Sequence, residues 1–377
     1  MIYGGLGDSR TRRTVTGMAR VLRALRLDGM LLSGLIAVSL FGLFVLWSAA
    51  GDNDALWFSQ LARVGIGFVL LVVLAQIPDH FLRMLSPAAF VVGLVLLAVV
   101  ALVGDIGKGA QRWLDLGVIR FQPSEIMKLA VPMMCAWYLH QRPLPPSLRD
   151  VGAVLLIILV PVGLIAEQPD LGTALLVAAS GTIVLVMGGL SWTSILGGIA
   201  ILGAAVPVGW HFMHEYQRQR VLTLLDPQSD ALGAGYHIIQ SQIAIGSGGV
   251  FGKGWMNGSQ AQLEFLPERS TDFIFAVIGE ELGLLGLMAL LVGYLFIVGR
   301  GMTMALQCRD AFTRLLAGSI ALTFFVYACV NAGMVMGLLP VVGVPLPLVS
   351  YGGTSFVTLM AGFGILMALH SSRKLVG

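Results

Sequence analysis

The chain has 377 residues, of which 57% are hydrophobic and 11% are charged, and its formal net charge is +3. Soluble domains carry about 25% charged residues, so this composition excludes a soluble globular protein and indicates an integral membrane protein. A net charge of this size gives little information about function. We expect no nucleic-acid partner.

Ten apolar runs follow in chain order, each long enough to cross a bilayer as a helix. They predict an all-α integral membrane protein with about ten transmembrane helices. A cytoplasmic N-terminal segment, 1–29, precedes a single polytopic membrane domain, 30–377, which includes a long extracytoplasmic loop, 212–272, between the seventh and eighth helices. The predicted spans are 30–50, 61–77, 84–104, 124–140, 151–167, 172–189, 193–211, 273–299, 314–338 and 352–371.

Arginine and lysine are unequally shared between the two sides of these spans. Short connections on the other side from the N-terminus keep only Lys108, Arg112 and Arg120. By the positive-inside rule both ends are cytoplasmic, and the long loop and the other polar connections face the exterior. The basic residues on the N-terminal side are Arg10, Arg12, Arg13, Arg20, Arg23, Arg26, Arg83, Arg142, Arg149, Arg300, Arg309, Arg314, Arg373 and Lys374.

Carboxylates stand where the long loop turns into the eighth predicted span. Asp272 lies at the junction, and Glu280 and Glu281 lie inside the span. A charge in hydrocarbon costs roughly 2.5–3.5 kcal/mol, so such residues usually mark function or a tight ion pair. Asp272 is either an N-terminal cap of the helix or a general base for a sugar hydroxyl, and the sequence leaves both open. Glu280 is expected to tie helices together.

Basic residues near the exterior side suit a phosphate-bearing lipid. Glu125 and Lys128 are three residues apart and share one helix face. They form either an internal ion pair or a site in which the acid holds the lysine toward a substrate phosphate. Arg112, Arg220 and Lys253 are further candidates, and ordinary head-group anchoring is the alternative for them. His211 and His214 have ligand-like spacing without a third ligand, so we predict no metal site.

Several segments, in this order, resemble the SEDS family (shape, elongation, division and sporulation). Together they extend the resemblance from about residue 28 to the end of the chain, and they are closer to the rod-shape elongation branch than to the division branch. They include Arg112-Trp-Leu-Asp-Leu-Gly117, Phe121-Gln-Pro-Ser-Glu-Ile-Met-Lys128, Gln168-Pro-Asp-Leu-Gly-Thr173, Gln240-Ser-Gln-Ile-Ala-Ile-Gly-Ser-Gly-Gly249, Thr271-Asp-Phe-Ile-Phe-Ala276 and Leu346-Pro-Leu-Val-Ser-Tyr-Gly-Gly353.

The resemblance implies a peptidoglycan glycosyltransferase of the bacterial inner membrane that joins lipid II into glycan strands. It places the catalytic aspartate on Asp272 and the acid and lysine of the cavity on Glu125 and Lys128. It also implies a class B penicillin-binding protein and the rod elongation complex as partners. The family usually has histidine where Ser270 stands, which leaves a mechanism that needs an imidazole there without support.

Other readings of the sequence stay open. A divalent cation, Mg²⁺ or Mn²⁺, could share the charge of the pyrophosphate, although no ligand cluster demonstrates one. A lipid II flippase is the alternative function, because Glu280 and Glu281 would suit a path for a polar head group. A scaffold without catalytic activity, which only recruits the cross-linking partner, is the third.

Overall fold

The computed structural model describes residues 17–371 apart from 52, 108–109, 116–119, 214, 231–232, 264 and 267. Several residues used above, namely Arg10, Arg12, Arg13, Lys108, His214, Arg373 and Lys374, lie outside the described residues. The division into 1–29 and 30–377 stays a prediction.

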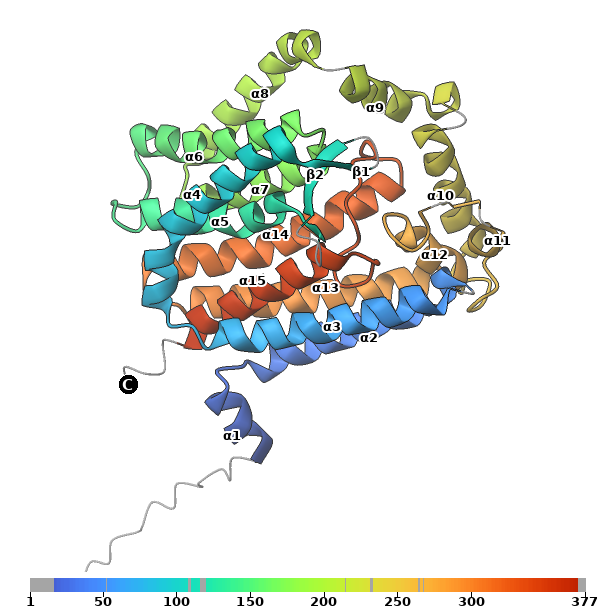
Figure 1. Ribbon diagram of the computed structural model, residues 1–377, viewed down its shortest axis with the longest axis horizontal. Coiled ribbons are helices and arrows are strands. Elements are labelled where there is room, and N and C mark those ends of the chain that lie inside the picture. Colours follow the sequence, from blue (N-terminus) through green and yellow to red (C-terminus); the bar gives the residue numbers. More distant parts are fainter. Residues whose placement is uncertain are drawn as a thin grey trace, which may run out of the picture.

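The described residues form a helical molecule in which every predicted span is helical (Figure 1). The helices are α1 (Gly17–Ala24), α2 (Gly29–Ala50), α3 (Asp54–Ala75), α4 (Asp79–Val103), α5 (Pro123–Leu139), α6 (Leu148–Glu167), α7 (Leu171–Met187), α8 (Trp192–Phe212), α9 (Glu215–Leu225), η1 (Pro227–Asp230), α10 (Ala234–Gly248), α11 (Ser259–Gln262), α12 (Ile274–Glu281), α13 (Gly283–Leu306), α14 (Ala311–Val335) and α15 (Gly353–Ser371).

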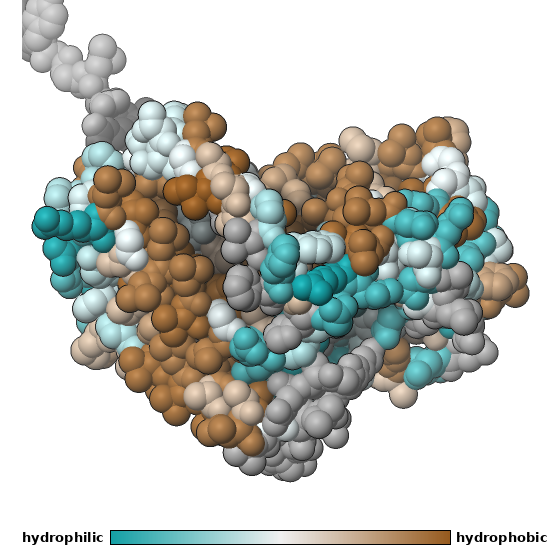
Figure 2. Space-filling view, turned by 90° about the horizontal axis from the view of Figure 1, so that it is seen from above, coloured by the Kyte–Doolittle hydropathy of each residue, from teal (hydrophilic) through white to brown (hydrophobic). Residues whose placement is uncertain are grey.

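Seven helices within the described residues are long and apolar enough to cross a membrane: α2, α3, α4, α6, α13, α14 and α15. Two further apolar helices, α7 and the part of α8 over Trp192–Pro207, are shorter. Helix α5 has only 17 residues and carries two charged side chains in its first half. Figure 2 shows a broad apolar band with hydrophilic residues on both sides of it, as expected for a chain that faces lipid. The all-α membrane class is therefore confirmed.

The eighth predicted span, 273–299, is wrong as one continuous helix, because α12 ends at Glu281 and α13 begins at Gly283. Gly283 has a φ of 65°, in the left-handed region that suits glycine. The next two backbone N–H groups, of Leu284 and Leu285, donate to the carbonyl oxygens of Gly249 and Val250. Tertiary hydrogen bonds to the preceding loop therefore replace the helical ones at this break.

A small antiparallel sheet lies between α4 and α5, where the sequence suggested only an irregular polar connection. Its strands are β1 (Asp105–Gly107), β2 (Ala110–Asp115) and β3 (Arg120–Phe121), paired in the order β1-β2-β3. The sheet is short and does not change the fold class.

Helix α14 lies at the centre of the bundle. It packs against α5, α7, α13 and α15, and most of its side chains are buried. Helices α9 to α11 gather at the end of the bundle opposite to the C-terminal end of α15 (Figure 1). The residues discussed next lie on α14, on the helices around it and on the loops at that end.

Candidate active site

Asp272 lies in the turn that precedes α12. The N-cap residue of α12 is Phe273, and its side chain makes no capping hydrogen bond. Asp272 is therefore one residue outside the N-cap. It does not occupy the N-cap position that the sequence allowed. The residue is partly exposed, as an acid that meets an incoming substrate must be.

A side-chain amide of α14 fixes the backbone at Asp272. Asn331 Nδ2 donates to the carbonyl oxygen of Asp272 at 2.9 Å and to that of Val344 at 2.6 Å. Asn331 is fully buried, so these bonds are shielded from water. A Cβ atom built on Gly343 would lie 3.6 Å from Asp272 Oδ2, so the loop after α14 passes beside the carboxylate.

The same loop also binds the two residues before Asp272. Ser350 Oγ donates to the carbonyl oxygen of Thr271, and the backbone N–H of Tyr351 donates to that of Ser270 at 2.8 Å. These contacts use only the backbone of Ser270, so its side chain is not needed to hold the turn. Hydrogen bonds to three successive carbonyl oxygens therefore hold the turn that carries Asp272.

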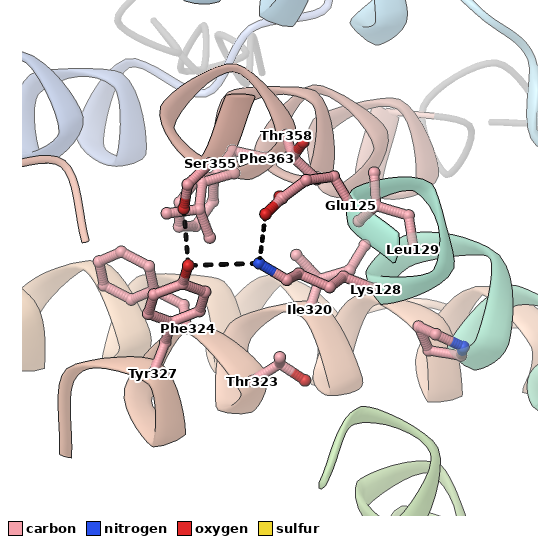
Figure 3. A pocket seen from close by; sticks show the side chains of 13 residues that line it. Glu125, Lys128, Leu129, Ile320, Thr323, Phe324, Tyr327, Ser355, Thr358 and Phe363 are labelled. Carbon is pink, nitrogen blue, oxygen red and sulfur yellow. Dashed lines mark hydrogen bonds and ion pairs between the residues drawn. The ribbon is translucent and has the colours of Figure 1, made fainter. Parts of the chain in front are cut away.

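Glu125 and Lys128 form a buried ion pair at the start of α5. Lys128 Nζ lies 2.7 Å from Glu125 Oε1, and the two side chains are 8% and 7% exposed. The internal ion pair that their spacing allowed is therefore present. Glu125 Oε2 is buried, and no described residue hydrogen-bonds to it. The pair lines a cavity of about 30 Å³ between α5, α14 and α15 (Figure 3).

Lys128 also contacts the hydroxyl of Tyr327 across this cavity, and Tyr327 in turn contacts Ser355 (Figure 3). Its ammonium donates to the Tyr327 hydroxyl at 3.3 Å and lies 5.0 Å from the centroid of that ring. The Tyr327 hydroxyl and Ser355 Oγ are 2.6 Å apart. A cavity of this size holds about two water molecules, and Lys128 lies almost fully buried at its wall.

Two arginines lie together beside the loop between α6 and α7. Arg112 Nε donates to the carbonyl oxygen of Gln168 at 3.3 Å, and its Nη2 donates to that of Pro169. Burial lowers the pKa of Arg220 from its usual value, and the positive charge of Arg112 lowers it further. Arg220 Nη1 is buried, and no described residue accepts from it. Two arginines whose charges act on each other, one of which keeps an unused buried donor, suit an anion.

An acid at the N-terminal end of α7, Asp170, acts electrostatically on Arg220. Its Oδ1 caps α7 by accepting from Thr173 N at 3.1 Å, and its Oδ2 accepts from Gln122 Nε2 at 2.7 Å. The negative charge of Asp170 acts on both Lys128 and Arg220. The charge of Asp170 therefore acts on a lysine and an arginine that were predicted from separate motifs.

Lys253 has a different environment. Its Nζ lies 2.7 Å from Glu280 Oε1, and Glu280 is fully buried. Glu280 also accepts from the backbone N–H groups of Gln260 and Ala261. This network ties the long loop to α12, which agrees with the tie expected for Glu280. Lys253 therefore neutralises a buried carboxylate of α12.

Within the described residues no group of three or more His, Cys, Asp or Glu side chains could hold a metal ion. His211 Nδ1 lies 3.1 Å from the carbonyl oxygen of Pro207, in the same helix. The described residues therefore do not fit a metal held by the protein alone.

A comparison with known protein families decides the identity of the fold. The model of the FtsW, RodA and SpoVE family, described as "cell cycle protein", matches residues 25–375. The chain belongs to this family. The resemblance of its motifs to the SEDS family is thereby confirmed.

Relatives within the SEDS family cover nearly the whole chain. The peptidoglycan glycosyltransferase MrdB of Escherichia coli K12 is 52% identical over 351 residues, which cover 93% of this chain and 95% of that protein. A chain from a structure on the coordination of polymerization and crosslinking by a peptidoglycan synthase complex has a TM-score of 0.81. It is 34% identical, and the match covers 92% of this chain and 98% of that chain.

The rod shape determining protein RodA of Thermus thermophilus is a further structural relative. Its TM-score is 0.70 and its identity 31%, with 92% of this chain and 97% of that chain covered. Together with MrdB, it confirms the assignment to the elongation branch of the SEDS family.

Several residues of the site were missed in the sequence. Asn331 and Tyr327 are polar side chains in an otherwise apolar helix, which is itself a signal of function in a membrane protein. Arg63 was counted within a predicted span, although an arginine at that depth carries the same signal. Asp170 belongs to a family motif, but nothing in the sequence shows that its charge acts on Lys128 and Arg220.

Proposed function

We propose that this chain is a peptidoglycan glycosyltransferase of the bacterial inner membrane that polymerises lipid II into glycan strands for cell elongation. The observation that carries the proposal is the 52% identity to MrdB over 93% of the chain, together with the fixed backbone at Asp272. The proposed orientation has both termini in the cytoplasm and the site on the periplasmic side.

In the proposed reaction Asp272 is the general base. It removes the proton from the 4-hydroxyl of the acceptor GlcNAc, and that oxygen attacks the anomeric carbon of the donor MurNAc. The bond from this carbon to the pyrophosphate oxygen breaks, and undecaprenyl pyrophosphate leaves with the electron pair. The backbone bonds from Asn331, Ser350 and Tyr351 support this role, because they fix the position from which the carboxylate acts.

Negative charge grows on the pyrophosphate as it leaves, so cations nearby stabilise the transition state. Arg112 and Arg220 are the proposed contacts, since they lie together and Arg220 retains an unused buried donor. Lys128 contributes through its positive charge at the wall of the cavity. A divalent cation at the pyrophosphate stays a prediction, and no step here depends on it.

A class B penicillin-binding protein is the proposed partner. The structural relative with a TM-score of 0.81 comes from a complex in which polymerization and crosslinking are coordinated. A shared fold over 92% of the chain supports a comparable assembly here, with the partner cross-linking the strands that this chain makes.

Among the described residues, the contacts of Glu280 and Glu281 do not favour the flippase alternative. Glu280 and Glu281, which would suit a path for a polar head group, are bound to Lys253 and to Ser48 Oγ, the latter at 2.6 Å.

The decisive experiment incubates the purified protein, alone and with its class B partner, with labelled lipid II in detergent. Glycan chains are the expected result. Lipid II that crosses vesicle membranes without any chains would move the assignment to a flippase.

A further inference from the structure

An arginine inside α3 faces the loop that carries Tyr351. Arg63 Cζ lies 4.4 Å from the centroid of the Tyr351 ring. A Cβ atom built on Gly353 would lie 3.1 Å from Arg63 Nε, so the guanidinium also rests on the backbone at the start of α15. Its Nη1 is buried, and no described residue accepts a hydrogen bond from it. No acidic side chain among the described residues forms an ion pair with it.

This position is costly for a charge that has no counter-ion. Arg63 is nine residues from the beginning of α3, roughly 14 Å along the helix. Gln60 shares its face of the helix, donates to the carbonyl oxygen of Ser350 at 3.3 Å, and keeps its own Oε1 buried without a partner in the described part of the chain. A cation left unneutralised at membrane depth indicates an anionic ligand.

The surface that Arg63 touches is part of the Asp272 support. Tyr351, on whose ring Arg63 lies, donates its backbone N–H to Ser270 at 2.8 Å. Ser350, which accepts from Gln60, donates its hydroxyl to Thr271. Arg63 is therefore two contacts away from the turn that carries the proposed base, and it approaches that turn from α3.

Arg63 is partly exposed, and apolar side chains near it on α3 face the surface of the bundle. Phe58, Leu61 and Ile66 on α3 are 62%, 41% and 58% exposed. Arg112 and Arg220 stand on β2 and α9, whereas Arg63 stands on α3 beside α15. The molecule thus presents two separate basic positions, on different elements, to ligands that travel in the membrane.

Joining two lipid-linked sugars brings two pyrophosphate groups to one base, and only one of them leaves. The arginine pair is assigned above to the leaving group. We propose that Arg63 binds the pyrophosphate of the second substrate, the acceptor lipid II, and holds its sugar toward Asp272. This inference rests on the proposed function, and it adds a binding residue that the family motifs in the sequence do not include.

The test measures initial rates of glycan synthesis in phosphatidylcholine nanodiscs with Arg63→Gln and Arg63→Lys. A lost hydrogen bond between charged groups weakens binding about tenfold or more, so Arg63→Gln is expected to raise KM for lipid II by that factor with kcat within about twofold. Arg63→Lys restores part of the affinity. The matched control is Arg149→Gln, at an exposed arginine far along the chain, with unchanged KM. A role confined to folding would lower thermal stability without a selective change in KM.

A second measurement separates this inference from the function on which it rests. The number of lipid II molecules bound per chain is measured in the Asp272→Asn protein, which is expected not to convert them to glycan. The expected stoichiometry is two per chain, and one when Arg63→Gln is added. If the wild type polymerises lipid II but Arg63→Gln changes neither KM nor the stoichiometry, the inference is overturned and the proposed function stands. A drop from two to one without polymerisation by the wild type would uphold the site and overturn the function. Loss of the Arg63 effect when phosphatidylglycerol replaces phosphatidylcholine would assign the site to bulk lipid and overturn the proposal.

Discussion

Asn331 Nδ2 donates to the backbone carbonyl oxygen of Asp272 at 2.9 Å. One helical turn earlier on α14, the Tyr327 hydroxyl accepts from Lys128. Four residues advance a helix by about 6 Å, so a single rigid helix connects the proposed base to the Glu125–Lys128 pair. A change at Asn331 or at Tyr327 is therefore expected to affect both the proposed base and the ion pair.

Asn331→Ala should lower kcat more than it raises KM for lipid II. The variant leaves the carbonyl oxygens of Asp272 and Val344 without a donor and releases the backbone under the base. Misplacement of a catalytic group by about 1 Å can cost about a hundredfold in rate, and we expect a loss of about ten- to a hundredfold. Steady-state kinetics at a temperature well below the melting point check this. A folded variant with wild-type kcat would show that the amide does not position Asp272.

The Glu125–Lys128 pair calls for a double-mutant cycle. Removal of one partner leaves a buried charge and destabilises by about 3–5 kcal/mol, so Glu125→Gln and Lys128→Met are each expected to lower the melting temperature strongly. The double variant removes both charges and should recover much of this stability. If Lys128 serves the reaction, the recovered protein stays inactive. Recovery of activity together with stability would assign the pair to folding alone.

Lys253→Met should destabilise the fold without impairing the chemistry. Its ammonium neutralises the fully buried Glu280, so the variant leaves that carboxylate without its ion pair. We expect a lower melting temperature and, at low temperature, a kcat within about twofold of wild type. The double variant with Glu280→Gln should be more stable than Lys253→Met. A large fall in kcat in a protein of normal stability would return Lys253 to the substrate site.

His237 on α10 gives the fold a dependence on pH. Its ring stacks on Phe273 with centroids 5.6 Å apart, and burial holds its pKa below the usual value, while Glu268 and Asp230 oppose this in part. Because the unfolded chain binds the proton more readily, stability is complete above about pH 6.5 and falls as pH drops toward the lowered pKa. Melting temperatures between pH 7.5 and 5.5 should fall more in wild type than in His237→Gln. Equal falls would contradict this account.

The helices could be predicted from the sequence because a long apolar run has no other stable form in a bilayer. The break between α12 and α13 could not. Gly283 stands in an apolar run like any glycine of a membrane helix, and its positive φ is fixed by bonds to Gly249 and Val250, which are distant in the sequence.

The site shows the same division between local and distant contacts. Glu125 and Lys128 are three residues apart on one helix, so their pairing was predictable. Lys253 and Glu280 are 27 residues apart, and only the fold shows that one neutralises the other. The partners of Asn331 and Arg63 near Asp272 were equally hidden, because they come from loops that no local pattern places.

The role of Asp272 is tested most directly by the rate at which labelled lipid II is converted to glycan by the Asp272→Asn protein. General-base catalysis contributes about a hundred- to ten-thousandfold to a rate, so we predict a loss of at least about a hundredfold. The melting temperature and the binding of the class B partner are measured on the same preparation and should match those of wild type. Full polymerisation by a well-folded Asp272→Asn protein would contradict the general-base mechanism.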